Sequence, residues 1–325
     1  MQDKLIIAIP SKGRLEENAA ALFDKAGMRL KRDAARGYTG HIPGMDNVEI
    51  AYLSASEIAT RLRDGAVHIG ITGEDLLREE VSDLDTTILL LKPLGFGHAN
   101  VVVAIPDGWS DVTHMSDLAE VAGDFRSRHG QRLRVATKYF QLTQDFFALQ
   151  GITDYTIVRS FGATEGAPAS GAAEVIVDIT STGTTLTANQ LRVPDDGVIL
   201  KSEANLAASL SADWSAPARA AIRQILHRLD ARADAENMVE LSFEMSASDE
   251  SWLPDLCKQF DAKAVGDIKT ITSGSLSVIL KKTMIASFSE ALHQKGKAIV
   301  TGRDASHIFT ARNEIFDRLV SRLPA

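Results

Sequence analysis

Short apolar runs alternate with helix-like segments through the first two thirds of the chain, and this alternation constrains the fold most strongly. The runs are rich in Val, Ile and Leu, as strands buried on both faces of a sheet are. Two consecutive sets, divided after Pro106, predict two α/β lobes that face each other across a cleft, each a mostly parallel sheet flanked by helices. Expected strands are residues 4–9, 48–53, 67–71, 88–91, 100–105, 134–136, 155–160 and 198–201, and expected helices are 15–27, 55–64, 115–122 and 141–150.

The pattern changes in the last third of the chain. Residues 215–236 carry apolar side chains on one helical face, which predicts a long amphipathic helix. An order of strand, helix, two strands, helix and strand follows, and this order is typical of a ferredoxin-like α+β domain. The strands are expected at 239–245, 264–272, 275–281 and 298–301, and the helices at 252–260, 285–294 and 313–323.

Composition and charge exclude several classes of function. The chain has 325 residues, 45% of them hydrophobic, and a formal net charge of −8, which argues against a nucleic-acid-binding surface. The single cysteine, Cys257, allows no intramolecular disulfide and fits a reducing compartment. The apolar run at residues 5–9 stops at Pro10 and is too short for a signal peptide or a membrane span. We therefore expect a cytoplasmic protein without nucleic-acid or membrane partners.

The segment from residue 175 to residue 189 is the strongest candidate for a binding site. Its apolar start predicts a buried strand that ends at Asp178. A small-residue turn from a strand into a helix presents backbone N–H groups and hydroxyls to an anion such as phosphate. A carboxylate beside it can receive ribose hydroxyls or help to place magnesium, so the two together favour a phosphorylated sugar. The alternative is an ordinary connection that binds nothing. The turn consists of Thr180, Ser181, Thr182, Gly183, Thr184 and Thr185.

Two cations stand where the first expected strand turns into the first helix. Lys12 and Arg14 flank Gly13 at this point. In a parallel α/β lobe this end of the strand opens onto the binding crevice. Helix N-termini favour acids, so two cations there run against the helix dipole and indicate a ligand with phosphate groups. An exposed charged turn is the alternative.

Four ordered blocks make the chain similar to the ATP phosphoribosyltransferase family. The resemblance covers the first two thirds of the chain and implies transfer of the phosphoribosyl group of phosphoribosyl pyrophosphate to N1 of the adenine of ATP. In that family the reaction opens histidine biosynthesis and needs no covalent nucleophile. The blocks are Ile9–Leu15 (IPSKGRL), Gly70–Leu76 (GITGEDL), Val135–Tyr139 (VATKY) and a signature with Glu165, Gly171, Ala173, Ile176, Asp178, Thr182, Gly183, Thr185 and Leu186.

The resemblance also implies a domain plan and a set of site residues. The two lobes, similar to periplasmic binding proteins, would comprise residues 1–105 with 188–225 and residues 106–187. Phosphoribosyl pyrophosphate would bind Asp178 and the turn after it, and Lys12, Arg14 and Asp178 would act electrostatically. Mg²⁺ would be held mainly by the substrate, with Asp178 as its candidate protein ligand. ATP would contact Arg14, Tyr38, Thr72, Gly73 and Glu165.

One position departs from the family pattern. Many members carry an arginine at the start of the segment that here reads Ser54–Ile58, and Arg36, Arg61 and Arg63 are the candidates to supply its charge. Two other functions stay open. One is another phosphoribosyltransferase, although the chain lacks the two adjacent acids usual in the commoner class. The other is a non-catalytic two-lobed sensor of nucleotides or phosphate.

Longer members of the family carry a third domain that binds histidine. Residues 226–325 are therefore expected to form a regulatory or assembly domain that pairs between subunits of a homo-oligomer, a dimer or a hexamer. Histidine as a feedback inhibitor is the first expectation for this domain. A different effector, or a role in assembly alone, is the alternative. The sequence decides neither the number of subunits nor the need for a separate regulatory subunit.

Overall fold

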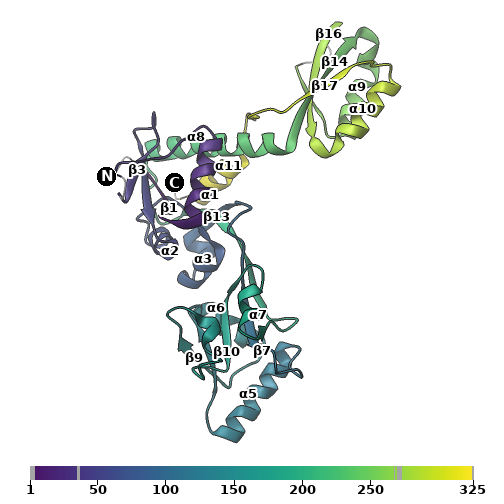
Figure 1. Cartoon of the computed structure of the whole chain (residues 1–325). Coiled ribbons are helices and arrows are strands. Elements are labelled where there is room, and N and C mark those ends of the chain that lie inside the picture. The colour runs from purple at the N-terminus through teal and green to yellow at the C-terminus, as the bar shows by residue number, and fades with distance from the viewer. Residues whose placement is uncertain (1–3, 35–36, 267, 269–272, 324–325) are drawn as a thin grey trace. The chain divides into compact units, whose positions relative to one another are not determined.

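The computed structural model describes residues 4–34, 37–266, 268 and 273–323. Its first sheet contains β1 (Leu5–Pro10), β2 (Lys31–Arg32), β3 (Thr39–His41), β4 (Val48–Leu53), β5 (Ile69–Gly73), β6 (Ile88–Pro93) and β13 (Ala204–Ser209). The strands lie in the order β2-β3-β4-β1-β5-β13-β6. Figure 1 labels β1, β3 and β13 of this sheet. β1 pairs in parallel with β4 and β5, whereas β13 pairs antiparallel with β5 and β6. β13 was not predicted, because ANLAAS has few large apolar residues.

Helices α2 (Ala55–Arg63) and α3 (Glu74–Glu80) cover one face of the first sheet. Ile58 and Leu62 of α2 and Leu77 of α3 pack with Ala8 of β1. A Cβ at Gly70 would lie 2.5 Å from Cγ2 of Ile58, so α2 approaches β5 closely only because that position is glycine. The other helices of this lobe are α1 (Gly13–Lys25) and α4 (Leu84–Thr87).

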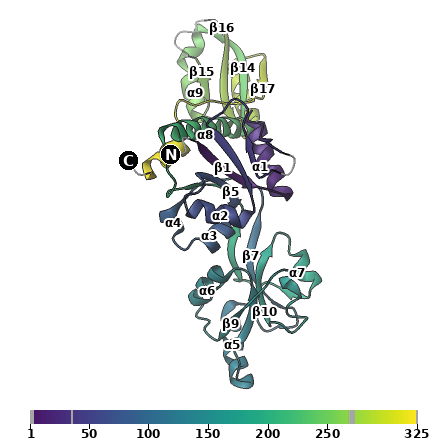
Figure 2. The ribbon, with the colours of Figure 1, turned by 90° about the vertical axis from the view of Figure 1, so that its left-hand side faces the viewer.

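The second sheet contains β7 (Ala99–Pro106), β8 (Leu133–Thr137), β9 (Tyr155–Arg159), β10 (Val175–Thr180), β11 (Leu191–Arg192) and β12 (Val198–Ser202). Their order is β11-β7-β10-β8-β9, with β12 also paired to β7. Helices α5 (Met115–His129) and α6 (Phe140–Leu149) contribute Met115 and Phe147 to the core on one face, and α7 (Thr184–Ala188) contributes Leu186 to the core on the other. Figure 2 shows α6 and α7 on opposite sides of β10.

The strand pairing corrects the expected lobe boundaries. β7 and β12 were assigned to the first lobe, which was expected to end at residue 105 and to resume at residue 188. Both strands belong to the second sheet, since β10 and β12 each pair antiparallel with β7. The chain therefore passes between the sheets at residues 94–98 and at residue 203, between β6 and β7 and between β12 and β13.

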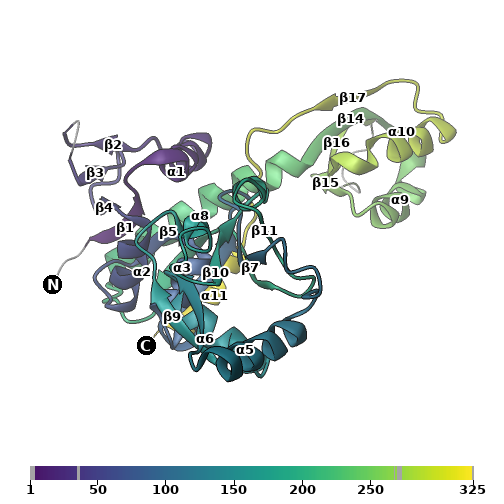
Figure 3. The same ribbon diagram turned by 60° about the horizontal axis from the view of Figure 1, so that its bottom comes forward.

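The third domain has the expected ferredoxin-like order. It consists of β14 (Met238–Ser246), α9 (Leu253–Gln259), β15 (Lys263–Val265), β16 (Ser273–Lys281), α10 (Ile285–Gln294) and β17 (Val300–Arg303). Its antiparallel sheet has the order β15-β16-β14-β17. Leu253 of α9 and Phe288 of α10 pack in one core with Leu241 and Val278 of the sheet. Figure 3 shows the helices α9 and α10 beside the strands of this domain. β15 is shorter than predicted, and residues 267 and 269–272 of that prediction lie outside the described residues.

The chain's internal contacts divide the described residues into two compact units. One contains residues 4–21, 29–221 and 318–323, and the other contains residues 22–28 and 222–317. The long helix α8 (Ala216–Asn237) and the last helix α11 (Glu314–Arg322) each contribute to both units. The end of α11 was expected in the third domain. It belongs to the first unit, because Arg318 donates to the carbonyl of Leu90 (3.3 Å) and Arg322 to that of Asp85 (2.5 Å).

Candidate functional site

The loop from β10 into α7 has the conformation of an anion cradle. Gly183 stands at φ 76°, a left-handed conformation that favours glycine, immediately before α7. Its N–H donates to Oγ1 of Thr180 at 2.9 Å, and the hydroxyls of Thr182 and Thr184 lie 2.9 Å apart. The side chains of Ser181, Thr182, Thr184 and Thr185 are exposed. The loop is thus internally braced while its hydroxyls face solvent.

Several donors of this loop are unused. Within the described residues, the backbone N–H groups of Thr182, Thr184 and Thr185 have no hydrogen-bond partner. Unpaired N–H groups where a helix begins attract anions. The hydroxyl of Ser181 is the exception, because it donates to the carbonyl of His98 at 2.9 Å and so anchors the loop to the segment before β7.

Asp178 is paired with a lysine that was not among the expected site residues. β8 and β10 are parallel with Thr137 opposite Val177, so the next residues, Lys138 and Asp178, stand side by side. The Nζ atom of Lys138 lies 3.8 Å from Oδ1 of Asp178, whose side chain is 17% exposed. The signal for Lys138 was present in the VATKY block, since the carboxyl ends of adjacent parallel strands meet at one edge of a sheet.

The turn with Lys12 and Arg14 leaves both cations free. Both side chains are exposed, and neither forms an ion pair within the described part of the chain. Gly13, between them, stands at φ 75° at the start of α1, so glycine is favoured there. The backbone just before the turn is held because the N–H of Ser11 donates to the carbonyl of Leu53 at 2.8 Å.

Arg32 supports this turn and was missed by the sequence reasoning. Its guanidinium donates to the carbonyl of Ser11 at 2.9 Å and to Oε1 of Glu16 at 2.6 Å. It also lies over the ring of Tyr52, 3.7 Å from the centroid. No local pattern marks Arg32, because its partners come from other elements of the fold.

Thr72 and Gly73 serve the packing of the first lobe. Thr72 is fully buried (0% exposed), and its hydroxyl donates to the carbonyl of Ala55 at 2.8 Å. The hydroxyl of Thr72 is thus used within the first lobe, and ATP binding at Thr72 stays a prediction. A Cβ at Gly73 would lie 2.2 Å from Oδ1 of Asp75, so glycine is required here by the Asp75 carboxylate.

Tyr38 and Glu165 have side chains available to a ligand. The side chain of Tyr38 is 74% exposed. Its carbonyl accepts from the N–H of Tyr52 at 2.8 Å, which attaches the residue to the edge of the first sheet. Glu165 lies in the short 3₁₀ turn η1 (Thr164–Gly166), half-buried and without a side-chain partner among the described residues.

Comparison with known proteins decides the family. The family model described as HisG, ATP phosphoribosyltransferase, matches residues 54–231. An ATP phosphoribosyltransferase of Bradyrhizobium sp. (strain ORS 278) is 51% identical over 320 residues, 98% of each chain. One of Afipia carboxidovorans is 48% identical over 326 residues, 100% of each chain. The chain belongs to the ATP phosphoribosyltransferase family.

As an ATP phosphoribosyltransferase, the chain is an enzyme whose reaction opens histidine biosynthesis. It transfers the phosphoribosyl group of phosphoribosyl pyrophosphate to N1 of the adenine of ATP and releases pyrophosphate. This assignment excludes the two alternatives, another phosphoribosyltransferase and a non-catalytic sensor. A solved structure, the ATP phosphoribosyl transferase (HisG:HisZ) complex from Thermotoga maritima, matches with a TM-score of 0.54 and 25% identity, over 70% of this chain and 96% of that one.

The arginine that many ATP phosphoribosyltransferases carry near Ser54 has no evident replacement on α2. Arg61 and Arg63 lie in the last turn of α2, where Arg61 pairs with Glu57 (3.3 Å) and Arg63 with Asp64 (2.9 Å). Arg36, the third candidate, lies outside the described residues.

Among the residues that the structure describes, no helix is long and apolar enough to cross a membrane.

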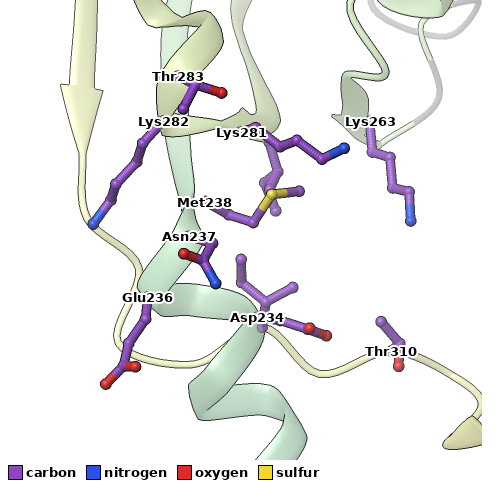
Figure 4. Close-up of a pocket in the computed structure, with 11 residues that line it drawn as sticks. Asp234, Glu236, Asn237, Met238, Lys263, Lys281, Lys282, Thr283 and Thr310 are labelled. Atoms are coloured by element: carbon purple, nitrogen blue, oxygen red, sulfur yellow. The ribbon is translucent and has the colours of Figure 1, made fainter. Parts of the chain in front are cut away.

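The third domain of this ATP phosphoribosyltransferase contains a pocket of about 610 Å³ (Figure 4). Lys263 and Lys281 enter it from the sheet, and Asp234 enters it from α8. Lys281 also lies 3.6 Å from Asp261. The pocket thus combines charged side chains of both signs with apolar lining residues. Its lining residues are Asp234, Glu236, Asn237, Met238, Lys263, Ile279, Lys281, Lys282, Thr283, Ile308 and Thr310.

Proposed function

We propose that the loop after β10 binds the phosphate of phosphoribosyl pyrophosphate and that Asp178 receives the ribose hydroxyls. The observation that carries the proposal is the set of free N–H groups on Thr182, Thr184 and Thr185 at a loop that begins beside the Asp178–Lys138 pair. Exposed hydroxyls of Thr182, Thr184 and Thr185 add further donors. A carboxylate accepts sugar hydroxyls, while N–H and O–H donors suit phosphate oxygens.

ATP binds, in this proposal, to the first lobe and to the turn before β10. Arg14 meets the phosphates, Tyr38 and Glu165 meet the adenosine, and the backbone around Gly73 lines the pocket. Thr72 contributes through its backbone, while its hydroxyl holds β5 to the start of α2. Lys12 and Arg14 are suited to phosphate because both are exposed cations without a partner in the described part of the chain.

The chemistry needs alignment and charge compensation. The lone pair of adenine N1 attacks C1 of the ribose, and the C1–O bond breaks with its electrons going to the departing pyrophosphate. Positive charge develops on the ribose, as in an oxocarbenium ion, while negative charge develops on pyrophosphate. Lys12 stabilises the leaving group, Arg14 compensates the charge of the ATP phosphates, and the loop donors fix the sugar phosphate. No side chain needs to form a covalent bond.

Magnesium fits this site only as a companion of the substrate. In the described ranges, no three His, Cys, Asp or Glu side chains are grouped so as to hold a metal ion. Asp178 is the carboxylate at the loop, and it already faces Lys138. Mg²⁺ would be held mainly by oxygens of the substrate, with Asp178 as its candidate protein ligand, and would supply charge neutralisation.

Binding measurements on substituted loops test the proposal. Thr182→Val and Thr185→Val keep the side-chain volume but remove a donor, and Asp178→Asn removes a charge. Each is expected to weaken binding of phosphoribosyl pyrophosphate by about 1–3 kcal/mol in calorimetric titration, with little change in melting temperature. Thr156→Val, on the exposed face of β9, is the matched control. Unchanged affinity in all three loop variants would contradict the assignment.

For the third domain we propose that it binds histidine as a feedback inhibitor and that it pairs between subunits. We also propose that the enzyme is cytoplasmic. The mixed charges of the pocket suit a zwitterion, so it is the first place to test. Removing residues after Glu236 would also remove α11 from the first unit, so substitutions in the full chain are the better test. Lys263→Met should weaken histidine binding measured by calorimetry, and Lys258→Met, an exposed lysine on α9, should not. Absence of any histidine binding to the full chain would leave assembly, measured by sedimentation, as the role of this domain.

A further inference from the structure

A buried polar network joins α3 to the strand ends of the second sheet. Its centre is Asp75, which is 6% exposed. The hydroxyl of Tyr139 donates to Oδ2 of Asp75 at 2.8 Å, and the hydroxyl of Ser202 donates to Oδ1 at 2.8 Å. The N–H of Asp75 returns a bond to Oγ of Ser202 at 3.0 Å. Burial raises the pKa of Tyr139, and the charge of Asp75 raises it further, so the phenol keeps its proton and remains a donor.

The same helix holds α6 at a second point. Oε1 of Glu79 accepts from the N–H groups of Phe140 (2.6 Å) and Gln141 (3.1 Å), and Oε2 accepts from that of Leu142 (3.1 Å). A carboxylate at the start of a helix satisfies donors that have no partner within the helix. Asp75 and Glu79 are four residues apart and so lie on one face of α3. This face therefore fixes both Tyr139 and the helix that follows it.

The network holds the backbone around Lys138, whose side chain is half exposed. The N–H of Tyr139 donates to Oγ1 of Thr137 at 2.8 Å, and the hydroxyl of Thr143 donates to the carbonyl of Tyr139 at 2.5 Å. Thr137 and Thr143 are both fully buried. The backbone on each side of Lys138 is thus fixed, and its ammonium lies 3.8 Å from Asp178.

The network also reaches the ATP side of the proposed site. Asp75 follows Gly73 by two residues, and Oδ1 of Asp75 occupies space that a Cβ at Gly73 would need. The carboxylate of Asp75 therefore lies against Gly73, at the strand end assigned to ATP. The same carboxylate binds the hydroxyl of Tyr139, which follows Lys138 in the chain. Both oxygens of Asp75 have donors, so the arrangement is rigid and not merely close.

We propose that Tyr139 and Asp75 are positioning residues that set the distance between the two bound substrates. The inference rests on the proposed assignment of Asp178 to phosphoribosyl pyrophosphate and of Gly73 to ATP. Neither residue needs to touch a substrate. Transfer between two bound molecules depends steeply on their alignment, and a displacement of about 1 Å can cost on the order of 100-fold in rate. Loss of the phenol hydroxyl should therefore lower kcat while each substrate alone still binds.

The test compares kcat, substrate affinity and melting temperature in Tyr139→Phe. We expect kcat to fall ~10- to 100-fold, with the Kd of each substrate within about twofold of wild type. Tyr155→Phe is the matched control, because Tyr155 packs on Phe147 and its hydroxyl has no hydrogen-bond partner among the described residues. The control should retain wild-type kcat. Wild-type kcat in Tyr139→Phe, with only a lower melting temperature, would overturn the proposal.

A double variant separates alignment from stability. Tyr139→Phe with Asp75→Leu replaces a half-satisfied buried carboxylate by apolar groups, so the melting temperature should recover. If kcat stays low, the network acts by positioning; if kcat recovers with stability, the proposal is wrong.

Asp178→Asn distinguishes a failure of the proposed phosphoribosyl pyrophosphate site from a failure of the positioning inference. Should that variant bind phosphoribosyl pyrophosphate normally, the proposed site fails. Should it bind weakly while Tyr139→Phe turns over normally, only the positioning inference fails.

Discussion

The ammonium of Lys138 stands 3.8 Å from Oδ1 of Asp178, at the adjoining carboxyl ends of two parallel strands. This pair keeps the carboxylate oriented beside the loop that we assign to phosphoribosyl pyrophosphate. Lys138→Met should raise the KM for that substrate by an amount equivalent to about 1–3 kcal/mol, because a charge-assisted contact is lost. Steady-state kinetics at saturating ATP measure this effect. Lys201→Met, an exposed lysine on β12, is the control, and equal KM values in both variants would argue against the pair.

Arg14→Lys tests the geometry of phosphate recognition. An ammonium cannot reproduce the two parallel bonds of a guanidinium, so kcat/KM should fall by about tenfold or more while the melting temperature stays unchanged. Stability should not respond, since Arg14 is exposed and unpaired within the described ranges. Arg29→Lys, at another exposed arginine, provides the control. Wild-type kinetics in Arg14→Lys would mean that the residue is only a solvated charge at the start of a helix.

His68 predicts a pH dependence of stability in the first lobe. The ring is 5% exposed, its Nδ1 accepts from the N–H of Ile6 (3.1 Å), and its Nε2 donates to the carbonyl of Asp213 (2.9 Å). Burial lowers the pKa of His68, so the unfolded chain binds the proton more tightly than the folded one. The free energy of unfolding should therefore decrease as the pH falls below the ordinary histidine value of about 6.5.

Hydrogen exchange of the Ile6 amide reports this effect locally. Its protection should drop between pH 7 and pH 5 in the wild type, after correction for intrinsic exchange, and should depend less on pH in His68→Gln. His129→Gln, at an exposed histidine on α5, should behave like the wild type. Equal pH profiles for wild type and His68→Gln would contradict the expectation.

The ion pair of Asp249 and Lys297 should stabilise the third domain at neutral pH and lose this effect in acid. The two side chains are 4% and 11% exposed. Burial alone would raise the pKa of Asp249, but hydrogen bonds from Lys297 and Ser246 outweigh it, and the pKa is lowered. A lowered pKa means that this stabilisation is present above the unfolded value of about 3.9 and is lost as the pH falls through the lower folded value.

Lys297→Met leaves a buried charge without its partner and should cost about 3–5 kcal/mol in denaturant unfolding at pH 7. The loss should be smaller at pH 3, where the unfolded carboxylate is already protonated. Lys281→Met breaks an exposed pair with Asp261 and should cost at most about 1 kcal/mol. A similar cost for both variants would show that burial of the Asp249 pair has no special effect.

Local signals in the sequence predicted most of the elements. Apolar runs predicted β1, β4, β5, β8 and β10, and the order of elements predicted the ferredoxin-like domain. β13 was not predicted, because its small residues form a strand only when they pair between β5 and β6. This pairing depends on the whole sheet. The lobe boundaries were misplaced for the same reason, since only pairing with β7 assigns β12 to the second sheet.

The local conformations of the candidate loops were predictable where glycines and small residues mark a turn. The loop after Asp178 and the turn at Gly13 have the conformations that their residues indicated. Arg32 and the Asp75–Tyr139 contact were not predictable, because 64 residues separate the latter pair along the chain and no periodicity connects them. The burial of Thr72 was not predictable either, because its hydroxyl donates to the carbonyl of Ala55, 17 residues away.

The place of β13 in the first sheet has a consequence for synthesis on the ribosome. Among the described strands, β6 has β13 as its only neighbour, so β6 cannot join the sheet until residues 204–209 have left the exit tunnel. Until then β5 presents an open edge, and the second lobe, inserted between β6 and β13, is already available to fold. The first lobe to begin is thus completed after the second, and nascent chains whose residues 204–209 are still inside the tunnel should depend on chaperones.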